Sequence, residues 1–128
     1  MALAPLSAET LRALKTIFPA WMNPRNPVDL WPAIERRGLH AYATAIQALL
    51  SDPQVDALYL HLYMDGKILA EALDLLSPLK GTAKRAAIWL IGDPQCFREF
   101  RDGVKPLGVP VFAEVGRGAH ALSLESTF

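Results

Sequence analysis

Two apolar runs that are too short for buried helices constrain the fold of this chain most strongly. Residues 57–63 and 86–91 are rich in strand-forming side chains. Neither run alternates cleanly between apolar and polar residues, which is typical of strands covered on both faces in a parallel sheet. A third run, residues 109–113, contains Pro110 near its start. Proline cannot donate to a sheet ladder, so this run is predicted to be an edge strand.

Helices are predicted before and between these runs. Ser7 can cap a first helix, which Pro19 ends. Apolar residues at helical spacing predict four more helices, over residues 39–49, 66–76, 97–104 and 116–122. Residues 21–32 hold several prolines and are predicted to form an ordered loop. Strands that alternate with helices indicate an α/β fold, with a small parallel sheet and helices on both of its faces.

Composition excludes several classes of function. The chain has 128 residues, which fits a single domain over residues 1–128. Its net charge is zero, so it lacks the positive surface of a nucleic-acid binder or of a membrane-surface protein. No apolar run is long enough to span a membrane, and the N-terminus is not a secretory signal. We therefore expect a cytoplasmic protein. The single cysteine, Cys96, excludes an internal disulfide and a multi-cysteine zinc site.

Two polar turns carry the most specific patterns. One is Asn-Pro-Val-Asp-Leu at residues 26–30, and the other is Ser-Asp-Pro at residues 51–53, just before the first strand. Asn26 and Asp29 could shape part of a site wall, or they could hold the turn by bonding to nearby backbone N–H groups, which turn chemistry favours. If Asp29 is a buried acceptor, its replacement by alanine should cost roughly 1–3 kcal/mol.

The order of these motifs resembles one domain of the NDP-forming acyl-CoA synthetases (acetate–CoA ligases, ADP-forming), which are relatives of succinyl-CoA synthetase. Residues 26–30, 49–57 and 108–112 carry the resemblance, which covers nearly the whole chain but only one of several domains of such an enzyme. It implies a flavodoxin-like domain of the succinyl-CoA synthetase type. In that family a strand and a glycine-rich turn precede the helix that here begins near Ser7, so this chain is expected to lack its first strand.

The resemblance implies a domain that is inactive alone. The complete enzyme would convert acid, CoA and ATP to acyl-CoA, ADP and phosphate, and would use CoA, ATP or ADP, and Mg²⁺. This chain is expected to hold no cofactor, metal or catalytic residue, and to contact other domains or subunits of the synthetase. The family's phosphorylated histidine lies in another domain, so His40, His61 and His120 do not take that role. His61 is instead predicted to be a hydrogen-bonded core residue.

One turn could still face an anion. In the relatives of succinyl-CoA synthetase, a helix N-terminus points toward the phosphohistidine, and residues 64–67 match that turn. Gly66 would allow close backbone approach, and free N–H groups suit an anion. Asp65 departs from the family's glycine-rich pattern, because its carboxylate would repel phosphate. Asp65 is therefore predicted to cap the helix.

Three other features have ordinary structural interpretations beside functional ones. Cys96 follows a predicted helix start, where a thiolate would be stabilised, but packing is its expected role. The turn at residues 92–94 follows the carboxyl end of a strand, where open α/β sheets bind ligands. Arg117, between two glycines, could lie near an anion. Each pattern is too common to identify a site.

A function from a different class remains open. The chain could be a free-standing module of the same fold that binds an anionic ligand or another protein. The two possibilities differ at the missing first strand. A fragment should leave a sheet edge or a helix-docking face uncovered, whereas a natural small protein would have covered it, for example by dimerising. Because zero net charge will not keep copies apart, we expect the isolated chain to form a homodimer or a higher assembly.

Overall fold

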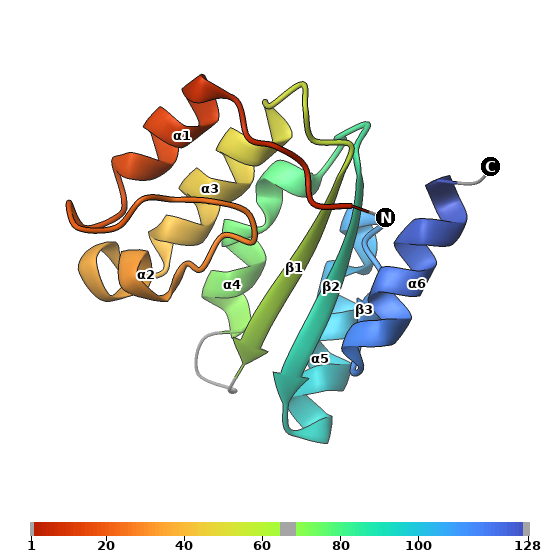
Figure 1. Cartoon of the computed structure of the whole chain (residues 1–128). Coiled ribbons are helices and arrows are strands. Elements are labelled where there is room, and N and C mark those ends of the chain that lie inside the picture. The colour runs from red at the N-terminus through yellow and green to blue at the C-terminus, as the bar shows by residue number, and fades with distance from the viewer. Residues whose placement is uncertain (1, 65–68, 127–128) are drawn as a thin grey trace. The chain divides into compact units, whose positions relative to one another are not determined.

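The computed structural model describes residues 2–64 and 69–126. The chain divides into two compact units, Ala2–Asp56 and Ala57–Phe128, which are described separately (Figure 1). The first unit contains three helices, and the second contains the whole sheet. The grouping of residues 1–128 into one domain stays a prediction.

The first helix begins where the sequence predicts. Helix α1 spans Ala8–Lys15, and the Ser7 side chain accepts a hydrogen bond from the Thr10 N–H at 3.3 Å. It ends earlier than the predicted boundary at Pro19. The Thr16 hydroxyl donates to the Ala13 carbonyl oxygen at 2.6 Å and satisfies one of the last carbonyl groups of the helix.

Helix α2, Trp31–Arg37, lies in and just beyond the segment that was predicted to be a loop. The prolines there predict extended chain, but Pro32 lies in the first helical turn, where a missing N–H group breaks no intrahelical bond. Gly38 ends α2 with a φ of 71°, and α3 follows over His40–Leu50, as predicted. The Arg36 and Arg37 side chains donate to the carbonyl oxygens of Phe18 and Thr16.

The core of the Ala2–Asp56 unit is built from small and large side chains together. Its fully buried members come from α1, the following turn, α2 and α3: Leu14, Ile17, Phe18, Ala33, Ala41 and Ala45. The alanines on α2 and α3 let these helices approach closely, and Phe18 fills the remaining space. Val28 and Leu30 pack against this cluster, which explains why the proline-containing turn is ordered.

The Ala57–Phe128 unit is a three-stranded parallel sheet with helices. Strands β1 (Ala57–Met64), β2 (Arg85–Gly92) and β3 (Val111–Phe112) lie in the order β1-β2-β3. The remaining elements are α4 (Leu69–Leu75), α5 (Pro94–Val104), α6 (Val115–Ser126) and short 3-10 helices at Ser77–Leu79 and Lys105–Leu107. The α/β fold predicted from the sequence is confirmed.

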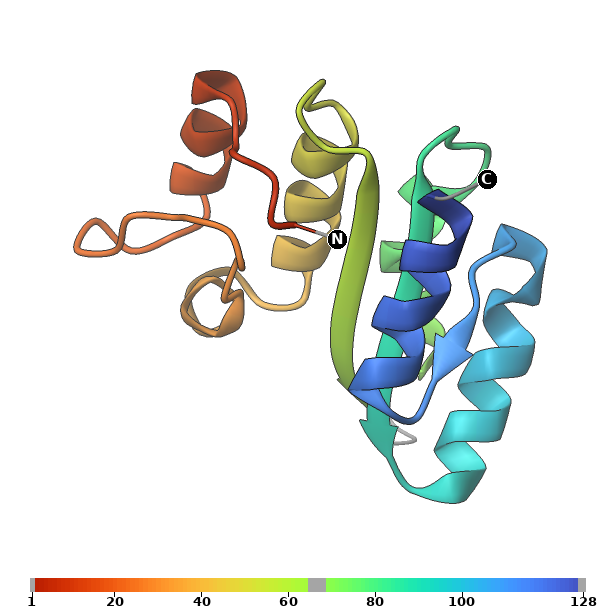
Figure 2. The same cartoon turned by 45° about the vertical axis from the view of Figure 1, so that its right-hand side comes forward.

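The two faces of the sheet are covered differently. Figure 2 shows α6 in front of β2 and α4 behind it, so helices lie on both faces. Leu58, Leu60 and Leu62 of β1 are buried, whereas the alternate residues His61 and Tyr63 are exposed. The prediction that both faces of this strand are fully buried is therefore wrong for its second half. Burial alternates along β1 although hydropathy does not.

Strand β3 is shorter than predicted. Only Val111 and Phe112 pair with β2, instead of residues 109–113. The Pro110 carbonyl oxygen accepts a hydrogen bond from the Ile88 N–H at 3.0 Å, but Pro110 has no N–H to donate in return. The proline therefore limits the length of this edge strand, as its position predicts.

Candidate functional site

Asn26 and Asp29, the two polar residues of the most specific motif, make different contacts. The Asp29 side chain is exposed, and its Oδ1 accepts a hydrogen bond from the Trp31 N–H at 3.1 Å. That bond is the local turn contact that the structural interpretation expects. The half-buried Asn26 instead donates from Nδ2 to the Ala4 carbonyl oxygen at 3.1 Å, which ties the turn to the N-terminal segment. Both side chains hold backbone, and Asp29 is not a buried acceptor.

An open groove of about 370 Å³ runs beside Asn26. It is lined by Leu3, Ala4, Pro5, Leu6, Leu11, Pro24, Arg25 and Asn26. Its walls are mostly apolar, and Arg25 is the one charged residue among them. The groove could take an apolar side chain of a partner, but a reaction would need more polar groups than this lining supplies.

The buried carboxylate of this unit is Asp52, whose side chain is 1% exposed. Its Oδ2 accepts from the Ser7 N–H at 2.8 Å, and its Oδ1 accepts from the Gln54 N–H at 2.9 Å. Burial by itself raises the pKa of Asp52, but hydrogen bonds from the Ser7 N–H, the Thr10 hydroxyl and the Gln54 N–H lower it to about 2. Asp52 thus connects the start of α1 to the end of α3 as a charged structural residue.

The carboxyl-terminal half of β1 and β2 carries a largely aromatic face, which we define as His61, Tyr63, Trp89 and Ile91. Trp89 is half-buried, and the other three side chains are exposed. The register pairs His61 with Trp89 and Tyr63 with Ile91, so all four lie on one face of the sheet. The rings of His61 and Trp89 stack with centroids 4.0 Å apart. His61 Nδ1 lies 3.2 Å from the Trp89 carbonyl oxygen. His61 is hydrogen-bonded as predicted, but its predicted burial is wrong, because its side chain is exposed.

The boundary of the aromatic face is set by Tyr59, Gly118 and Val115. The Tyr59 hydroxyl donates to the Val115 carbonyl oxygen at the start of α6. A Cβ atom on Gly118 would lie 2.5 Å from the Tyr59 hydroxyl oxygen, so only glycine allows this approach. Arg117, considered from sequence as an anion ligand, instead forms an exposed ion pair with Glu114 at 3.7 Å.

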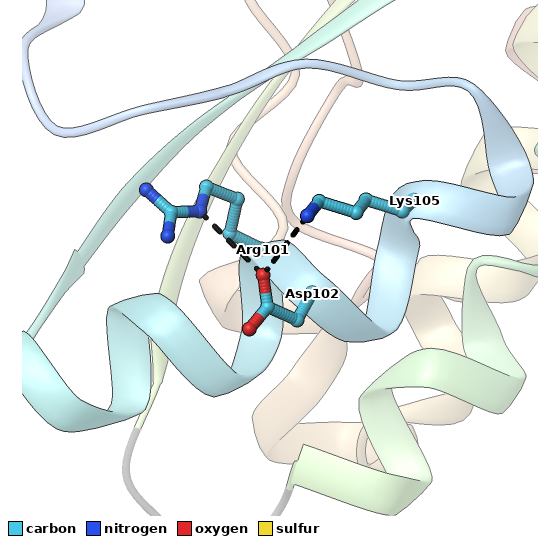
Figure 3. Close-up of polar contacts among 3 residues, drawn as sticks. All are labelled: Arg101, Asp102 and Lys105. Atoms are coloured by element: carbon cyan, nitrogen blue, oxygen red, sulfur yellow. Dashed lines mark ion pairs between the residues drawn. The ribbon is translucent and has the colours of Figure 1, made fainter.

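The turn after β2 caps a helix. Asp93 Oδ1 accepts from the Cys96 N–H at 2.9 Å, and this hydrogen bond lowers the pKa of Asp93. Cys96 itself is buried, in line with the predicted packing role. At the other end of α5, Arg101 and Lys105 both approach Oδ1 of Asp102, at 3.8 and 3.4 Å (Figure 3). All three side chains are exposed, so this cluster contributes little to stability.

The other candidate turn cannot be placed. Asp65 and Gly66 lie outside the described residues. Among residues 2–64 and 69–126, no three His, Cys, Asp or Glu side chains gather closely enough to hold a metal ion. In the same part of the chain, no helix has both the length and the apolar composition needed to cross a bilayer.

Neither the structural role of Asp52 nor the aromatic face is predicted from the sequence. The sequence predicts only a turn at Asp52, because its partner Ser7 is 45 residues away. Tyr59, His61 and Tyr63 recur at every second residue. That spacing of aromatic rings with polar atoms was a signal for one partly exposed strand face.

Comparison with known proteins supports the resemblance to the synthetases. No protein-family model matches the chain. Acetate–CoA ligase [ADP-forming] II of Archaeoglobus fulgidus is 28% identical over 121 residues, which is 94% of this chain and 18% of that protein. This homology is weak, but it extends over nearly the whole chain. The chain corresponds to a small part of a much longer enzyme.

A solved structure supports the fold. The crystal structure of PH0766 from Pyrococcus horikoshii OT3 matches with a TM-score of 0.62 and 17% identity. The match covers 89% of this chain and 27% of that one. The predicted flavodoxin-like α/β fold is confirmed. At this identity the match carries no information about activity.

Proposed function

We propose that this chain acts as one domain of an ADP-forming acyl-CoA synthetase or of a synthetase-like protein. The observation that carries the proposal is the match of 94% of the chain to 18% of an ADP-forming acetate–CoA ligase. The Asn-Pro-Val-Asp-Leu motif at residues 26–30 belongs to the same resemblance. The complete protein would convert acid, CoA and ATP to acyl-CoA, ADP and phosphate in the cytoplasm.

In this proposal the chain supplies surfaces rather than reacting groups. Asn26, Asp29 and Asp52 make backbone hydrogen bonds, which suits a structural role. The aromatic face and the groove beside Asn26 are candidate contacts for other domains or subunits of the synthetase. CoA, ATP and Mg²⁺ would bind elsewhere in the complete enzyme, where the phosphorylated histidine of the family is expected.

The first test is the activity of the purified chain. We expect no acyl-CoA formation from acetate, CoA, ATP and Mg²⁺, because the resemblance implies that the phosphorylated histidine and the nucleotide- and CoA-binding segments of the family lie in other domains. Chromatography detects any acyl-CoA that is released. Its release by the purified chain would contradict the proposal that this chain supplies no reacting groups.

The second test asks whether the chain can serve as the synthetase domain. The matching segment of the Archaeoglobus fulgidus ligase is replaced by this chain, and acetate-dependent ADP formation is measured. The control chimera carries Asp52→Ala, which should weaken the grafted domain. Activity in the first chimera and its reduction in the second would support the proposal. A folded first chimera without activity would contradict it and favour a free-standing binding module.

A further inference from the structure

We draw no further inference here: the strongest candidate, the largely aromatic face that His61, Tyr63, Trp89 and Ile91 form on the carboxyl-terminal half of β1 and β2, carries no proposal, because nothing in the structure shows what covers it.

Discussion

Asp29 and Asp52 lie in similar sequence contexts, close to proline in a turn, but the structure uses them differently. Asp29 belongs to the more specific motif, yet its side chain is exposed and accepts one local hydrogen bond. Asp52 belongs to a commoner Asp-Pro turn, yet it is 1% exposed and accepts from the backbone of Ser7 and Gln54. A distinctive motif is therefore a poor guide to which carboxylate stabilises this unit.

The largest expected effect is that of Asp52→Ala. The substitution leaves the Ser7 N–H without its acceptor and opens a small cavity, so we expect the free energy of unfolding to fall by about 2–3 kcal/mol. Urea denaturation followed by circular dichroism measures this change. Asp56→Ala, at an exposed aspartate four residues away, is the matched control and should change stability by less than about 0.5 kcal/mol. If Asp52→Ala and Asp56→Ala lost equal amounts of unfolding free energy, the buried Asp52 would contribute no more to stability than an exposed aspartate.

The acid dependence of stability sharpens the comparison further. The folded pKa of Asp52, about 2, lies below its ordinary value of 3.8. The stabilisation by ionised Asp52 is therefore complete above pH 3.8 and is lost as the pH falls through about 2. We expect this loss to be roughly 2 kcal/mol.

Asp52→Asn should lack that component of the acid dependence, because its amide does not titrate. The measurement is the difference in unfolding free energy between wild type and Asp52→Asn at pH 5 and at pH 2. The difference should shrink at low pH. A difference that stays constant with pH would show that the ionised form of Asp52 is not what stabilises the turn.

The smallest expected effect is that of Asp29→Ala. Because the side chain is exposed and makes one hydrogen bond, we expect a loss of less than about 0.5 kcal/mol, instead of the larger loss expected for a buried acceptor. The same denaturation assay measures it. A loss as large as that of Asp52→Ala would reverse the ranking and restore the motif as a structural element of the unit.

Much of the local structure could be predicted from the sequence. The cap at Ser7, the helix after Gly38 and the two long strands all follow from residues a few positions apart. The α/β class followed from the alternation of strands with helices. Helix α2 was missed because Pro32 was interpreted as a loop residue, although proline is equally suited to a first helical turn.

The sequence by itself therefore determined the fold class, most helix and strand positions and the polar turns, because caps, turns and periodicity depend on neighbouring residues. The tertiary structure alone decided that His61 is exposed and that Asp52 is the buried carboxylate. His61 has the same neighbours in the sequence whether or not a helix covers its face of the sheet. The Ser7–Asp52 hydrogen bond joins residues 45 positions apart. Such contacts exist only after distant segments pack together, so no local pattern specifies them.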